Sequence, residues 1–205
     1  MDEQADYPRR AERGRTYVYV LPCRDQDLLK IGFSRDPLHR FRTLHSRFHE
    51  FFDLDRGLLI ETDRLRDARR IERMFIETFV DYRALAPLVV PRSAAGHTEW
   101  YRGIDPLVNA VAREVSLAEG FALHAPLRPW LRGQLDAWSD QLYQWASRML
   151  EVVEYEHFNF AVTKTERNLR SMLGMYSALG VDVQAKVSAQ VFEWYENPGF
   201  FGSAS

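Results

Sequence analysis

The segment Tyr17-Val18-Tyr19-Val20-Leu21, followed by Leu28-Leu29-Lys30-Ile31-Gly32-Phe33, decides the predicted fold. Both runs are rich in β-branched and aromatic residues, which are typical of strands. A polar stretch from Arg24 to Asp27 separates them. We therefore expect two strands joined as a hairpin.

Helical signals follow this hairpin. Ser34 or Asp36 can cap a helix with Pro37 in its first turn. Apolar residues then recur at helical spacing, at Leu38, Phe41, Leu44, Phe48 and Phe51. Residues 54–60 predict a third strand, and Asp63 can cap a second helix over residues 65–79. This order predicts an α+β domain with a small, three-stranded, mainly antiparallel sheet flanked by helices.

The second half of the chain is predicted to be helical. Apolar residues from Leu131 to Val152 alternate steps of four and three, the pattern of a helix packed on another helix. Similar repeats cover residues 169–179 and 183–194. We expect a polar arm at 1–15, the α+β domain at 16–118 and an all-α hairpin or bundle at 119–205. The apolar stripe is interpreted as internal core, but part of it could form a homodimer or bind a protein partner.

The charge distribution favours local rather than general binding of nucleic acid. The net charge of -2 argues against a protein that coats nucleic acid with its whole surface. Residues 1–103 carry 19 Lys and Arg against 17 Asp and Glu, whereas residues 104–205 carry 8 against 12. All the cations of the first half except Lys30 are arginines, which suit phosphate. A compositional bias toward arginine on solvated faces explains this count equally well.

The sequence predicts a cytoplasmic protein without a membrane partner. No apolar run approaches the roughly 18 residues of a membrane helix. The start, Met1-Asp2-Glu3-Gln4, lacks the order of a signal peptide. Cys23 is the only cysteine, so neither a disulfide framework nor a thiolate-rich zinc site can form within the chain.

Four residues could share the tasks of phosphodiester hydrolysis, which needs a base, charge neutralisation and help for the leaving oxygen. They are Tyr19 and Lys30 on the two hairpin strands, Arg40 on the first helix and Glu72 on the second. Each also has a structural interpretation. Tyr19 could pack in the core, Arg40 could pair with Asp36, and Glu72 could belong to an ion-pair network.

Taken in order, these residues resemble the GIY-YIG nuclease superfamily. The motifs read Tyr17-Val18-Tyr19 and Lys30-Ile31-Gly32, and the segment from Lys30 to Arg40 resembles a branch, common in phages and bacteria, with lysine in the second motif. Ala68-Arg69-Arg70-Ile71-Glu72 is similar to the family's metal-binding segment, and Glu99-Trp100-Tyr101 to that branch's closing strand. The resemblance covers about residues 16–103.

The resemblance implies a metal-dependent endonuclease acting on nucleic acid, with DNA favoured over RNA. Glu72 would bind Mg²⁺ or Mn²⁺. Lys30 would favour the phenolate of Tyr19 as the base, or would orient the water or contact phosphate. Arg40 would stabilise the transition state.

Further residues are candidates for substrate contact. These are Gly32, Arg35, Arg47, His97 and Trp100. Gly32 would let the backbone approach the substrate closely. His45 and His49 lie one helical turn apart without an evident third zinc ligand, so a solvated face is the preferred interpretation.

Two departures from the family pattern support other hypotheses. Tyr17 stands where the first motif opens with glycine, and the asparagine that many members place in the last strand is absent. The domain could therefore be a catalytically degraded module that binds nucleic acid or a protein partner. A third hypothesis assigns the function to the helical half, as a dimerisation or partner-binding bundle.

Overall fold

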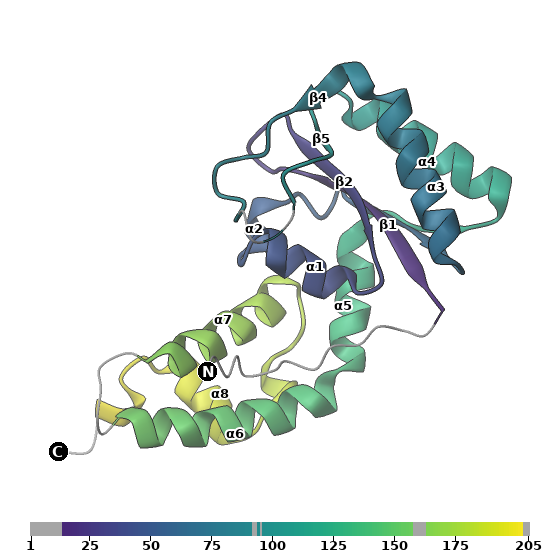
Figure 1. Cartoon of the computed structure of the whole chain (residues 1–205). Coiled ribbons are helices and arrows are strands. Elements are labelled where there is room, and N and C mark those ends of the chain that lie inside the picture. The colour runs from purple at the N-terminus through teal and green to yellow at the C-terminus, as the bar shows by residue number, and fades with distance from the viewer. Residues whose placement is uncertain (1–13, 92–93, 95, 158–162, 203–205) are drawn as a thin grey trace. The chain divides into compact units, whose positions relative to one another are not determined.

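The structure is a computed structural model that describes residues 14–91, 94, 96–157 and 163–202. These residues divide into two compact units, 14–130 and 131–202, and α5 (Leu127–Ala137) spans the boundary (Figure 1). The other elements of the first unit are β1 (Thr16–Pro22), β2 (Leu29–Ser34), α1 (Pro37–Leu44), α2 (Phe48–Phe51), β3 (Leu58–Thr62), α3 (Leu65–Thr78), η1 (Val80–Tyr82), β4 (Arg83–Ala84), β5 (Trp100–Tyr101), α4 (Asp105–Glu119) and β6 (Ala122–His124). The other elements of the second unit are α6 (Ser139–His157), α7 (Lys164–Ala178), η3 (Gln184–Lys186), α8 (Ala189–Glu196) and η4 (Phe200–Gly202).

The sheet of the first unit has six strands in the order β4-β5-β2-β1-β3-β6, and every pairing is antiparallel. The predicted α+β class and the helical second half are confirmed. The predicted number of three strands is too small, although β1, β2 and β3 do form the centre. The added strands β4, β5 and β6 are two or three residues long, too short to show an alternation of apolar and polar residues.

The two faces of the sheet pack against different helices. Val18, Val20 and Ile31 lie in one core with α3 and α4. Because side chains alternate along a strand, Tyr19 and Lys30 face the other side. There Phe41 of α1 meets Tyr19 edge to face, with ring centroids 5.4 Å apart. Figure 1 shows α3 and α4 beside each other along the sheet.

Several predicted boundaries were wrong for local reasons. The helix expected from Pro37 to Phe51 breaks at His45, which is extended and accepts a hydrogen bond from the Arg47 amide at 3.2 Å. The third strand begins only at Leu58, because Asp53 closes a turn by accepting the Gly57 amide at 2.9 Å. The helix cap at Asp36 is confirmed, since its Oδ1 accepts the His39 amide at 2.9 Å.

The other corrections concern caps and long helices. Arg64, not Asp63, occupies the N-cap position of α3, and no side chain caps it. The apolar stripe expected along one helix from Leu131 to Val152 is divided between α5 and α6 at Trp138. Of the predicted arm at 1–15, all but the last two residues lie outside the described part of the chain.

The second unit is built from helices packed around an apolar core. α6 packs against α7, and Leu150, Leu173 and Trp194 are buried there. Arg170 of α7 lies 4.2 Å over the Trp194 ring of α8 and donates to the Tyr195 carbonyl at 3.0 Å. No helix within the described ranges has both the length and the apolar composition needed to cross a bilayer.

Candidate active site

The register of the hairpin positions the first part of the candidate site. Tyr19 lies opposite Gly32, and Lys30 is two residues before Gly32 on the same face. A Cβ atom added to Gly32 would lie 2.7 Å from Tyr19 Cζ and closer still to its hydroxyl. In this structure Gly32 therefore makes room for the phenol of Tyr19, where the sequence suggested close approach of a substrate.

Arg40 reaches this phenol from the neighbouring helix. The capped first turn of α1 leads into Arg40, whose Nε donates to the Tyr19 hydroxyl at 3.2 Å. Its Nη1 also donates to the Ala94 carbonyl at 2.5 Å. The guanidinium is thus held between the sheet and the segment that precedes β5, and it remains partly exposed.

Lys30 is buried beside two acceptors. Its Nζ donates to the Ile31 carbonyl, lies 3.4 Å from Glu99 Oε2 and sits 5.9 Å from the centroid of the Tyr19 ring. Only 1% of Lys30 is exposed. Its pKa is lowered to about 8: burial is the main cause and Arg40 adds to it, while Glu99 and Glu72 oppose the shift. The amine can therefore exchange a proton close to neutral pH.

Tyr19 behaves differently from the expectation based on sequence. Burial raises the pKa of its phenol, the charges of Glu72 and Glu99 add to this, and Arg40 opposes it. The stabilisation of a phenolate by Lys30 stays a prediction, because in this structure desolvation outweighs the opposing effect of Arg40. At neutral pH Tyr19 carries a hydroxyl group that can donate or accept a hydrogen bond.

Glu72 belongs to the same electrostatic cluster although α3 packs on the other face of the sheet. Its neighbour Ile71 is fully buried, and Glu72 itself is half-buried. Burial raises the pKa of Glu72 and the carboxylate of Glu99 adds to it, whereas Lys30 and Arg40 lower it. The charges of Arg40 and Glu72 thus act on the pKa values of both Tyr19 and Lys30, which supports a common site.

Glu99 is the member of the site that sequence reasoning missed. Its φ of 57° is in the left-handed region, which is uncommon for residues other than glycine. Its backbone carbonyl accepts the Ile31 amide at 3.0 Å, and its carboxylate contacts Lys30 and Thr98. The segment Glu99-Trp100-Tyr101 was the available signal, but only the pairing of β5 with β2 shows that Glu99 faces Lys30.

The predicted substrate contacts have mixed surroundings. Arg35 and His97 are exposed, and Arg47 is exposed with its Nη2 2.6 Å from Glu50 Oε1. Trp100 is fully buried and its Nε1 donates to the Gly96 carbonyl at 2.6 Å. Its ring offers no open face to a nucleotide, so in this arrangement Trp100 supports the start of β5, directly after Glu99.

The residues around Glu72 fit a hard divalent cation held by few protein ligands. The described residues contain no group of three or more His, Cys, Asp and Glu that could hold a metal ion, and His45 stacks on Phe51. Glu72 instead lies within electrostatic reach of a second carboxylate, Glu99. A cation bound through one carboxylate, waters and substrate oxygens, as Mg²⁺ often is, would relieve this repulsion.

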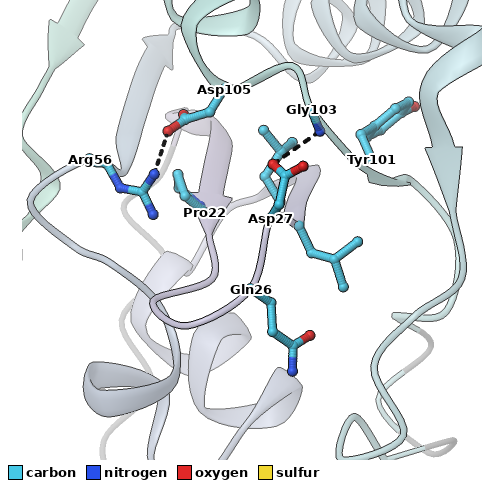
Figure 2. A pocket seen from close by; sticks show the side chains of 9 residues that line it. Pro22, Gln26, Asp27, Arg56, Tyr101, Gly103 and Asp105 are labelled. Carbon is cyan, nitrogen blue, oxygen red and sulfur yellow. Dashed lines mark hydrogen bonds and ion pairs between the residues drawn. The ribbon is translucent and has the colours of Figure 1, made fainter.

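A separate small pocket lies at the turn of the hairpin (Figure 2). Asp27 accepts the Gly103 amide at 3.1 Å, and Arg56 pairs with Asp105 at 3.0 Å across it. Its space of about 20 Å³ holds roughly one water molecule. None of the four predicted catalytic residues lines it. We interpret the pocket as a structural junction that fastens the start of α4 to the hairpin.

A match to a known protein family covers most of the first unit. Residues 16–116 match the T5orf172 domain. The match extends from β1 into α4, just under half of the chain, and it indicates a nuclease-like or nucleic-acid-binding module. No curated protein and no solved structure matched the chain.

The close contact between Gly32 and Tyr19 predicts the effect of a methyl group. Gly32→Ala should lower the free energy of unfolding by about 1–3 kcal/mol, because the ring of Tyr19 would have to move. Gly133→Ala in α5 is the control, since no atom lies within 4 Å of the added Cβ, and it should stabilise by about 0.4–1 kcal/mol. Urea unfolding of both variants measures this. A Gly32→Ala protein as stable as the wild type would contradict the packing described.

Proposed function

We propose that residues 16–116 form a divalent-metal-dependent endonuclease domain that hydrolyses phosphodiester bonds of nucleic acid, DNA in preference to RNA. The observation that supports this most strongly is the coupled cluster of Tyr19, Lys30, Arg40, Glu72 and Glu99. A phenol, an amine of lowered pKa, a guanidinium and a half-buried carboxylate are the groups that this reaction requires.

Glu72 is the residue that would hold Mg²⁺ or Mn²⁺. The ion would supply a positive charge to the phosphoryl oxygens and to the leaving oxygen. The carboxylate must be ionised to bind it, and the raised pKa of Glu72 means that a cation competes with a proton at this position.

The other side chains have complementary roles in this proposal. Arg40, partly exposed, binds the phosphate and neutralises charge in the transition state. The hydroxyl of Tyr19, fixed by Arg40, orients the attacking water. Lys30 in its neutral form accepts a proton from that water, and Glu99, 3.4 Å away, stabilises the ammonium that forms. Exposed Arg35, Arg47 and His97 are candidates for contacts farther along the substrate.

One observation favours a second function, binding of nucleic acid without cleavage. Tyr19 and Lys30 are each only 1% exposed, so the substrate meets mainly Arg40 and Glu72. A module that had lost its chemistry would keep such a buried polar pair for structural reasons. Salt-dependent binding without metal-dependent cleavage would identify this case. A homodimer or a protein partner through the helical unit remains a proposal for the second half.

Removal of the proposed metal ligand should abolish cleavage. Glu72→Gln keeps the shape of the side chain but removes its charge, and the cleavage rate of DNA with Mg²⁺ or Mn²⁺ should fall by about 100-fold or more. Glu77→Gln, an exposed residue on the same helix, is the matched control and should cleave like the wild type. Equal rates for Glu72→Gln and the wild type would refute the proposal.

The low pKa of Lys30 predicts the pH dependence of cleavage. Below about pH 8 the amine is protonated and cannot accept a proton, so the rate should rise with pH and level off above this value. Glu99 raises the pKa of Lys30 and of Glu72, so Glu99→Gln should move the midpoint to lower pH. Single-turnover rates from pH 6 to 10 measure both. A wild-type rate that falls as pH rises through 8 would contradict the role of Lys30.

A further inference from the structure

The arginines of α3 have different surroundings. Arg70 donates through both terminal nitrogens to the carboxylate of Glu119 on α4, with Nη1 2.8 Å from Oε1. Arg69 and Arg73 are exposed, and neither forms an ion pair with any residue that the structure describes. Arg69 and Arg73 are therefore open to solvent, whereas Arg70 is bound to Glu119 of α4.

Arg69 lies next to Glu72, the proposed metal ligand. Arg69 is three residues before Glu72, a spacing that makes two side chains neighbours on a helix. The charge of Arg69 lowers the pKa of Glu72, which agrees with this proximity. Arg73 follows Arg69 by one helical turn, about 6 Å along the axis. A phosphate held by Arg69 would lie beside Glu72, and one held by Arg73 would follow along the helix.

Some arginines of this unit have carboxylate partners, whereas others, such as Arg35 and Arg113, form no ion pair within the described residues. Arg47 pairs with Glu50, Arg56 with Asp53 and Asp105, and Arg128 with Asp55. Arg69 lies three residues before Glu72 and Arg73 four before Glu77, so both have an acidic neighbour on the helix, and their exposed guanidinium groups can also bind an anion. Guanidinium groups bind phosphate oxygens through paired N–H donors.

We propose that Arg69 and Arg73 bind backbone phosphates of the nucleic acid next to the phosphate that reaches Glu72. The proposal rests on the proposed function of the same site and adds the surface along which the substrate lies. The contacts are to the backbone, because two aromatic rings of the site, Tyr19 and Trp100, are at most 1% exposed and cannot stack on bases. Affinity from this surface is therefore independent of base sequence.

The test measures binding without cleavage. Fluorescence anisotropy follows two DNA duplexes of unrelated sequence, in EDTA, between 50 and 200 mM salt. The Arg69→Gln/Arg73→Gln double variant should bind both duplexes more weakly, with the slope of log affinity against log salt reduced by about 2. The control is Arg113→Gln at an exposed arginine of α4 that forms no ion pair within the described residues, and it should keep the wild-type slope.

The outcomes separate this inference from the proposed function. A double variant with the wild-type slope, an equal loss in Arg113→Gln, or no salt-dependent binding by the wild type would each overturn the surface. If wild-type protein cleaves DNA with Mg²⁺ while the double variant keeps its KM and slope, only the surface fails. If the double variant loses binding as expected and the wild type cleaves nothing with metal, the surface is supported and the nuclease proposal fails.

Discussion

The register between β1 and β2 is the constraint on which the candidate site depends. It places Gly32 opposite Tyr19 and puts Lys30 on the same face, and the phenol fills the space that a Cβ of residue 32 would occupy. A slip of one residue would turn these side chains toward the core shared with α3 and α4. The hairpin thus fixes the positions of Tyr19 and Lys30, which Arg40 and Glu99 contact.

Burial and charge together give this site its chemical character. Desolvation lowers the pKa of Lys30 and raises those of Tyr19 and Glu72, so in each group it favours the neutral form. The opposite charges of neighbouring side chains compensate only in part for this loss of solvation. Perturbed pKa values of this kind, gathered in one place, are common where side chains exchange protons or bind ions. The coupling between Glu72 and Glu99 is the feature that a cation would relieve.

Much of the fold could be predicted from the sequence, because long elements carry a clear pattern. The alternating runs of β1 and β2 and the apolar stripe of α3 identified the elements that carry Tyr19, Lys30 and Glu72. The rest depends on tertiary contacts. The two-residue strand β5 is too short for a pattern, and the position of Glu99 beside Lys30 follows from a pairing across 69 residues. Likewise, the surroundings of Trp100 depend on a tertiary contact, since its ring stacks on that of Phe52 with centroids 6.4 Å apart.

The proposed mechanism requires one phosphate and one metal ion to meet these side chains together. Its most direct test is anomalous diffraction from a crystal of the whole chain with Mn²⁺ and an oligonucleotide that cannot be cleaved. We expect a manganese peak on the Glu72 carboxylate, with a phosphate between it and the guanidinium of Arg40. A peak at another position, or a phosphate bound away from Arg40 and Glu72, would contradict the account.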